Sequence, residues 1–275
     1  MELRPFGDPS RQAPLLGLGT WMLEQGDRAA AIAALRRGID LGMAHVDTAE
    51  MYGSGKAEEV VGEALAGLRD RVFLVTKVLP QNATEKGTIE ACERSLARMK
   101  TDRVDCYLLH WPSSHPLEGT IRAFEKLRQA GKVLSYGVSN FDVEGLEEAV
   151  KLAGKGRIAC NQILYNLSER TAEHHVIPWC EKNGIAVVAY SPIGAQHFKS
   201  GKVLEEIAAA RRATPRQIAL AFLLHRKGVF AIPKSSVAAH VEQNAAAAAI
   251  ALTDDEVRRL DAAFPRGPWR GLATS

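Results

Sequence analysis

The chain has 275 residues, of which 46% are hydrophobic and 24% charged, and its formal net charge is +3 at pH 7. This composition is typical of a globular protein with a sizeable core and excludes a disordered chain. Because the net charge is small and like charges do not form long blocks, electrostatics gives no reason to expect nucleic acid or a membrane surface as a partner.

Apolar runs and amphipathic stretches alternate along the chain. The runs are short and continuously apolar, which is typical of parallel strands covered on both faces, and the stretches have the apolar spacing of helices. In chain order we predict strand 15–21, helix 27–42, strand 43–48, helix 56–68, strand 71–77, helix 84–99, strand 104–110, helix 119–131, strand 132–140, helix 142–154, strand 157–163, helix 172–184, strand 185–191, helices 202–212 and 214–228, strand 229–235, and helices 237–248 and 254–264.

Eight strand–helix units favour a closed (β/α)8 barrel, the TIM barrel, with a doubly wound open sheet as the alternative. No linker or change of composition divides the chain, so we expect one domain over residues 1–275. Residues 3–17 read as two short strands around the turn 7–10, a β-hairpin that could plug the bottom of the barrel. A capping-box pattern at Thr253 predicts a short C-terminal helix, which an irregular tail follows.

Four cysteines, at positions 92, 106, 160 and 180, stand in apolar stretches without a C-x-x-C pair. Buried, reduced thiols in a cytoplasmic protein are the favoured interpretation over disulfides. The first ten residues contain no apolar signal core, and the longest apolar run, 245–252, is too short to span a bilayer. The adjacent pair His174–His175 does not have metal-ligand spacing, so we predict no metal site.

Three ionisable residues end consecutive predicted strands: Asp47, Lys77 and His110. Tyr52 follows the first of them in the glycine-rich stretch DTAEMYGSG. Each residue alone has an ordinary structural explanation, as a helix cap, a rim charge, a structural histidine or a packed ring. Barrel enzymes carry their chemistry at the carboxyl ends of strands, and neighbouring strands lie about 5 Å apart. We therefore expect the four side chains to converge in one pocket.

Together the four residues suggest a proton donor. An ammonium beside a phenol favours the phenolate, so we expect Lys77 to lower the pKa of Tyr52 and Asp47 to hold Lys77 charged. Tyr52 would then act as a general acid toward a developing alkoxide, and His110 would hydrogen-bond the same oxygen.

The sequence resembles the aldo-keto reductases over essentially its whole length. The motifs that carry the resemblance, in family order, are GLGTW, DTAEMYG, VTK, LLHWP, GVSNF, NQILYN, AYSPIG and IPKSS. The resemblance implies that Asp47, Tyr52, Lys77 and His110 form the catalytic tetrad of a bacterial-type enzyme similar to methylglyoxal and 2,5-diketo-gluconate reductases. It implies NADPH-dependent reduction of small aldehydes, 2-oxoaldehydes such as methylglyoxal, or diketo sugar acids to alcohols, with the hydride from the nicotinamide and the proton from Tyr52.

The resemblance also implies a set of NADPH-binding residues. Ser139, Asn140 and Gln162 would bind the carboxamide, Tyr190 would stack on the nicotinamide, and residues 191–194 would follow the pyrophosphate. The 2′-phosphate and adenine would lie near Lys234 and residues that follow it. The full set is Gly19, Thr20, Asp47, Ser139, Asn140, Gln162, Tyr190, Ser191, Pro192, Ile193, Gly194, Lys234, Ser235, Ser236, His240, Gln243 and Asn244.

His240 stands where NADPH-preferring members of the family usually carry an arginine. We therefore expect NADPH to be preferred by a reduced margin, with NADH used at lower efficiency. Aromatic residues at the barrel mouth predict an apolar substrate pocket, which the tail could close. Its members would be Trp21, Tyr52, His110, Trp111, Phe141 and Trp269.

Two other functions compete with this interpretation. A catalytically weak NADPH-binding regulatory or sensing subunit of the same fold would retain the cofactor motifs. A barrel enzyme that uses Lys77 as a Schiff-base amine would leave GVSNF and AYSPIG unexplained. Phosphate motifs of other folds do not fit, because GLGTWM lacks the third glycine of a dinucleotide fingerprint and GSGK lacks P-loop spacing. We expect a monomer that acts on a small carbonyl compound.

Overall fold

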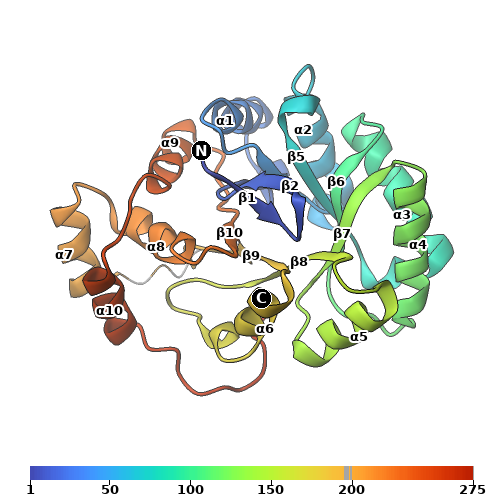
Figure 1. Cartoon of the computed structure of the whole chain (residues 1–275). Helices are drawn as coiled ribbons and strands as arrows, with labels where there is room; N and C mark the ends of the chain where they lie inside the picture. The colour runs from blue at the N-terminus through green and yellow to red at the C-terminus, as the bar shows by residue number, and fades with distance from the viewer. Residues whose placement is uncertain (195–197, 199, 275) are drawn as a thin grey trace.

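The computed structural model describes residues 1–194, 198 and 200–274. Its main sheet has eight parallel strands in the order β10-β9-β8-β7-β6-β5-β4-β3, and helices surround it (Figure 1). The strands are β3 (Leu18–Gly19), β4 (His45–Asp47), β5 (Phe73–Val78), β6 (Val104–Leu109), β7 (Val133–Ser139), β8 (Ile158–Leu164), β9 (Ala186–Tyr190) and β10 (Val229–Ala231).

Hydrogen bonds between β10 and the residues just before β3 close the sheet into a barrel. Gly17 donates to the carbonyl of Ala231 at 2.8 Å, and Ala231 donates to the carbonyl of Leu15 at 3.0 Å. Both end strands are shorter than the predicted 15–21 and 229–235, because the flanking residues pair only through isolated bridges. The predicted (β/α)8 barrel is confirmed.

All ten predicted helices occur in the part of the chain that the structure describes. Side chains of Asp27, Thr84 and Asp142 cap the first turns of three of them, and Thr253 forms the predicted capping box. The helices are α1 (Arg28–Asp40), α2 (Lys56–Ala64), α3 (Glu85–Met99), α4 (Leu117–Gln129), α5 (Val143–Ala153), α6 (Val176–Asn183), α7 (Lys202–Ala210), α8 (Pro215–Leu224), α9 (Ala238–Ala247) and α10 (Asp254–Ala263).

An antiparallel hairpin, β1 (Leu3–Phe6) and β2 (Asp8–Pro14), precedes the barrel. Its turn is tighter than the predicted 7–10, because Gly7 adopts a φ of +73° and Asp8 already begins β2. A Cβ at Gly7 would lie 2.5 Å from the backbone of Ala159, so only glycine lets the turn pack against β8 this closely.

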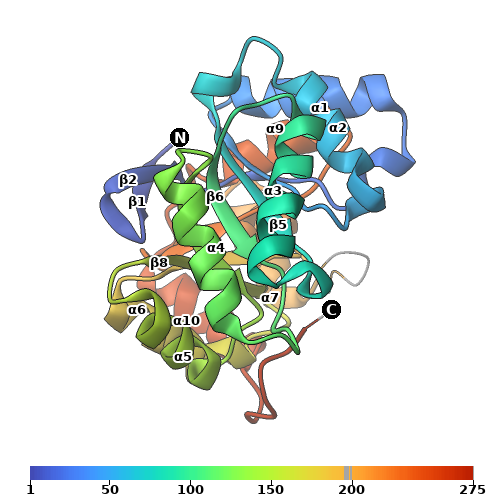
Figure 2. The same cartoon turned by 90° about the vertical axis from the view of Figure 1, so that its right-hand side faces the viewer.

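The hairpin closes one end of the barrel. The ring of Phe6 lies 4.8 Å from that of Phe73 and 5.2 Å from that of Phe230, centroid to centroid, and its edge faces His45. Figure 2 shows the hairpin at one end of the molecule and the C-terminal tail at the other. The carboxyl ends of the strands therefore form the open end of the barrel.

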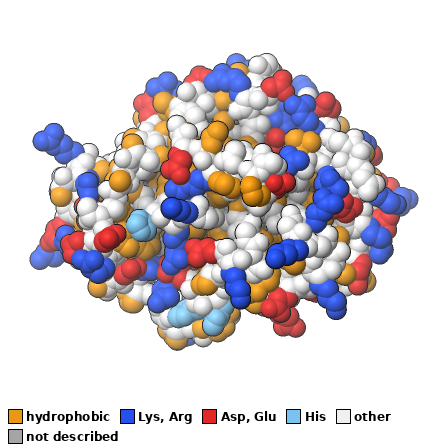
Figure 3. Space-filling model, in the orientation of Figure 1, with side chains coloured by type: hydrophobic (Ala, Val, Ile, Leu, Met, Phe, Trp, Pro, Cys, Tyr) orange, Lys and Arg blue, Asp and Glu red, His pale blue; other side chains and the backbone are white. Residues whose placement is uncertain are grey.

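The surface around the hairpin mixes charges of both signs. Figure 3 shows this face, where Lys and Arg side chains alternate with Asp and Glu rather than forming a patch. The four cysteines are buried and free. Among the described residues, no helix is long and apolar enough to cross a bilayer.

Candidate active site

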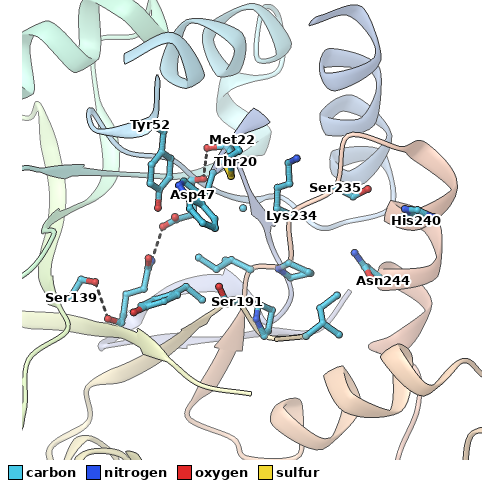
Figure 4. A pocket seen from close by; sticks show the side chains of 18 of the residues that line it. Thr20, Met22, Asp47, Tyr52, Ser139, Ser191, Lys234, Ser235, His240 and Asn244 are labelled. Carbon is cyan, nitrogen blue, oxygen red and sulfur yellow. Dashed lines mark hydrogen bonds between the residues drawn. The ribbon is translucent and has the colours of Figure 1, made fainter. Parts of the chain in front are cut away.

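A cavity of about 500 Å³ opens at the carboxyl ends of the strands. Loops after most barrel strands line it, together with the first turn of α8 and part of α9 (Figure 4). Tyr52 and Asp47 lie on one side of the cavity, and Ser235, His240 and Asn244 lie on the opposite side. The cavity is therefore elongated between two chemically different ends.

A buried ion pair underlies the first end. The ammonium of Lys77, near the end of β5, lies 2.5 Å from Oδ1 of Asp47 and donates to the carbonyl of Thr48 at 2.8 Å. The same nitrogen lies 3.4 Å from the hydroxyl oxygen of Tyr52. Lys77 and Asp47 are 0% and 1% exposed, so the cation has no solvent to screen it from the phenol.

The loop that carries Tyr52 bends through unusual backbone conformations. Gly53 and Ser54 both have a φ near +55°, and Gly55 has a φ of +92°. Glycine adopts such angles without steric cost, which explains the composition of this stretch. Glu50 anchors the loop by accepting hydrogen bonds from the backbone of Leu79 at 2.7 Å and from Asn82 at 2.9 Å. Tyr52 is thus fixed opposite the ammonium.

The electrostatics differ from the expectation in one respect. Burial raises the pKa of Tyr52 by more than the nearby Lys77 lowers it, so the net pKa is above its usual value of 10.0. The expected lowering of the pKa is therefore wrong, because the charge of Lys77 alone does not account for the desolvation of the phenol. Burial lowers the pKa of the Lys77 ammonium, but the interactions with Asp47 and Tyr52 raise it by more. The net pKa of Lys77 is therefore above its usual value. The resting site holds a neutral phenol beside a cation.

His110 follows β6 and faces the same space. Burial, with help from the charge of Lys77, lowers the pKa of His110 to about 3, so its imidazole is neutral near pH 7. The centroid of its ring lies 5.7 Å from that of Tyr52 and 4.8 Å from that of Trp111. A neutral imidazole has one N–H donor, which suits a hydrogen bond to an uncharged substrate oxygen.

A hydrogen-bonded group of amide and hydroxyl side chains lines the cavity next to Asp47 and Tyr52. Gln162 on β8 donates from Nε2 to Oδ2 of Asp47 at 2.7 Å, and Ser139 donates to the carbonyl of Gln162 at 2.9 Å (Figure 4). The hydroxyl of Tyr190, at the end of β9, donates to the side-chain oxygen of Asn140 at 3.0 Å. These contacts fix the orientation of side chains that face the cavity.

Most of the predicted site residues meet in this one cavity, and five do not line it. Lys77 lies behind the wall, in contact with Asp47. Gly194 and Ser236 are also outside the lining. Phe141 borders a neighbouring hollow with Pro112 and Leu272.

Trp269 packs elsewhere on the surface. Its ring centroid lies 5.0 Å from that of His175 and 6.4 Å from that of His174, whose Nε2 hydrogen-bonds the carbonyl of Gly267. The tail is therefore held against the helix that begins near these histidines, and Trp269 does not border the cavity.

Sequence reasoning missed several lining residues. Arg216 and Gln217 belong to none of the motifs and lie in the first turn of α8. Met22 has a φ of +58°, which no pattern predicts. The residues missed are Met22, Met51, Thr214, Arg216, Gln217, Ile232 and Pro233.

No group of metal-ligating side chains occurs among the described residues, where three or more His, Cys, Asp or Glu would have to converge.

Comparisons with known proteins agree on one family. The model of the aldo/keto reductase family matches residues 15–264. Methylglyoxal reductase YeaE of Escherichia coli is 46% identical over 259 residues, which cover 92% of this chain and 91% of that protein. Glyoxal reductase of Bacillus subtilis is 32% identical over 254 residues, covering 91% of this chain and 89% of that protein.

Solved structures give the same result. The crystal structure of an aldo-keto reductase from Klebsiella pneumoniae in complex with NADPH superimposes with a TM-score of 0.94 at 41% identity, covering 100% of this chain and 99% of that chain. A second structure from Klebsiella pneumoniae, with NADP and acetate, has a TM-score of 0.93 at 42% identity and covers 99% of both chains.

Proposed function

The chain belongs to the aldo/keto reductase family and is an NADPH-dependent oxidoreductase that reduces carbonyl groups, and we propose that its substrates are small aldehydes and 2-oxoaldehydes such as methylglyoxal. The names of the similar proteins from Escherichia coli and Bacillus subtilis support this substrate class. The cavity supports it too, because the exposed apolar side chains of Trp21 and Met51 border it. Diketo sugar acids remain the second substrate class to test.

The observation that carries the proposal is the 3.4 Å contact between the ammonium of Lys77 and the hydroxyl of Tyr52. In the proposed mechanism Tyr52 donates its proton to the carbonyl oxygen as negative charge develops there. The fixed cation of Lys77 stabilises the phenolate that remains, and Asp47 holds that cation in place. His110 orients the substrate oxygen with a hydrogen bond from its neutral ring.

The cavity residues fit NADPH. At one end, Ser139, Asn140 and Gln162 offer the donors and acceptors that a carboxamide requires, and the ring of Tyr190 lines the wall beside them. At the other end, Lys234 is exposed to the cavity and Ser235 lies beside it (Figure 4). When bound, NADPH supplies a hydride for the carbonyl carbon.

The remaining assignments complete the proposal. They are a single domain over residues 1–275, a monomeric state and a cytoplasmic location. The four free, buried cysteines support the cytoplasmic location. The net charge of +3 supports a function without nucleic acid or membrane partners. The alternative of a weak regulatory subunit has no support among the relatives described above, whose names are those of reductases.

A turnover screen tests the proposal. The purified chain is mixed with NADPH and a panel of methylglyoxal, glyoxal, aromatic aldehydes and a diketo sugar acid, and NADPH consumption is followed by absorbance. We expect the 2-oxoaldehydes to be reduced with the highest kcat/KM. Binding of NADPH without consumption with any carbonyl compound would favour the regulatory alternative.

A further inference from the structure

Arg216 is a cation at the edge of the cavity that the proposed mechanism does not use. It is the second residue of α8, its side chain is exposed, and it lines the cavity. Its guanidinium carbon lies 5.3 Å from the ring centroid of Phe198, a contact that leaves the N–H groups available. An arginine in this position can approach a ligand directly.

The charge of Arg216 is not compensated within the described residues. The nearby Arg211 and Arg226 form ion pairs with Glu256 at 2.6 Å and Glu181 at 3.4 Å, whereas the structure gives Arg216 no such carboxylate. Among the described residues that line the cavity, the only carboxylate is Asp47. That group is already held by Lys77 and lies at the opposite end. The far end is therefore cationic.

The first turn of α8 is docked on α9, which fixes where Arg216 lies. Gln217 donates from its side chain to the carbonyl of Gln243 at 2.8 Å. The N-cap Thr214 forms a capping box with the same Gln217, so this turn is rigid. Since His240 is one turn before Gln243, Arg216 borders the part of the cavity that contains His240 and Lys234, and not the part that contains Tyr52.

We propose that Arg216 binds the 2′-phosphate of NADPH and is a determinant of the preference for NADPH over NADH, an inference that rests on the NADPH-dependent function proposed above. A guanidinium is always charged and can donate two parallel hydrogen bonds to a phosphate. The ammonium of Lys234, which lines the same cavity, contributes only a point charge. The first turn of a helix adds a favourable field for an anion.

The experiment measures cofactor binding in the absence of any carbonyl substrate. Dissociation constants for NADPH, NADH and 2′,5′-ADP are obtained by tryptophan-fluorescence quenching and calorimetry for the parent, Arg216→Ala and Arg216→Lys. The matched control is Arg258→Ala, which removes one positive charge from a residue that is 70% exposed and pairs only with Asp255 three residues away. Alanine favours helices, so Arg216→Ala retains the fold, which its circular dichroism checks.

The expected result is selective. Arg216→Ala should weaken binding of NADPH and 2′,5′-ADP by about 10- to 100-fold, the range for a lost hydrogen bond to a charged group, and change NADH binding less than about twofold. Arg216→Lys should recover part of the lost affinity, because lysine keeps the positive charge but lacks the two parallel N–H groups of the guanidinium. The control should bind all three ligands like the parent.

Two results would overturn this inference and leave the proposed function standing. The first is an Arg216→Ala variant that binds NADPH as tightly as the parent does. The second is a variant whose affinities for NADPH and NADH fall equally, which would assign Arg216 to the pyrophosphate. A parent chain that binds no NADPH would instead overturn the proposed function, and this inference with it.

Discussion

Gln162 donates a hydrogen bond from Nε2 to Oδ2 of Asp47 at 2.7 Å, although the two residues are 115 positions apart in the chain. The other oxygen of the same carboxylate contacts the ammonium of Lys77. A single buried carboxylate therefore connects Gln162, at the end of the cavity where we propose that the nicotinamide binds, with the cation beside Tyr52. We expect substitutions at the proposed cofactor contact and at the proposed proton donor to influence each other.

Gln162→Leu tests this connection. The substitution leaves Oδ2 of Asp47 buried without that partner, which should lower the free energy of unfolding by about 1–3 kcal/mol and weaken NADPH binding. Gln162→Glu is the stronger change, because it sets a second carboxylate against the first. Chemical denaturation and fluorescence quenching measure both effects. Parent-like NADPH affinity in both variants would contradict a role for Gln162 in cofactor binding.

Tyr52→Phe removes the proposed proton donor and little else. Carbonyl reduction should fall by at least the factor of about 10²–10⁴ that a general acid contributes, while NADPH binding persists. Steady-state turnover with methylglyoxal and fluorescence quenching give the two readouts. A variant that retains a third of the parent turnover would rule out this role for Tyr52.

Lys77→Met should abolish reduction and also destabilise the fold. It leaves Asp47 buried and unpaired, and breaking a buried pair in this way costs about 3–5 kcal/mol. The double variant Lys77→Met/Asp47→Asn removes both charges, so it should recover much of the stability and none of the activity. Thermal unfolding and turnover separate the two effects. Activity in the stable double variant would show that the cation is dispensable.

His45 should make the fold sensitive to acid. Burial among aromatic rings lowers its pKa from 6.5 to about 4, so the unfolded chain binds a proton at higher pH than the folded chain does. Stability is therefore lost as pH falls from about 6.5 to 4, by about 2 kcal/mol between pH 7 and pH 5 for this one group. His45→Leu should show a smaller loss over that interval, measured by urea unfolding at both pH values. Equal losses in parent and variant would refute the assignment.

His240→Arg should widen the preference for NADPH over NADH, because an arginine is always charged and can bind a phosphate through two parallel N–H groups, which a histidine lacks. The ratio of kcat/KM for the two cofactors is the measurement. A ratio that is the same in the parent and in His240→Arg would argue against contact between His240 and the 2′-phosphate.

Most of the fold can be predicted from the apolar periodicity of the sequence, and part of the site can be predicted from the residues at the ends of the strands. The helices and the order of the strands follow from apolar spacing, and Asp47, Lys77 and His110 could be read from their positions at strand ends. The turn at Gly7 could not, because its tightness depends on contact with Ala159, 152 residues later. Such contacts leave no local signal in the sequence.

The errors at the site have the same origin. The direction of the pKa shift of Tyr52 depends on how completely neighbouring elements bury it, and charge patterning does not contain that information. Aromatic residues often line the mouths of pockets, which favours Trp269 at the cavity, whereas the ring of Trp269 packs against His174 and His175. Nothing in the local sequence of Arg216 distinguishes it from a solvated helix residue.

The opposite placement of the hairpin and the cavity has a practical consequence for attaching the protein to a surface or to another domain. Strand β1 lies at the closed end of the barrel, while the tail around Leu272 lies at the open end (Figure 2). A tether or reporter joined before Met1 would leave the entrance to the cavity unobstructed, whereas one joined after the tail would stand beside the path of the substrate. Immobilised preparations should therefore turn over faster when they are anchored through the N-terminus.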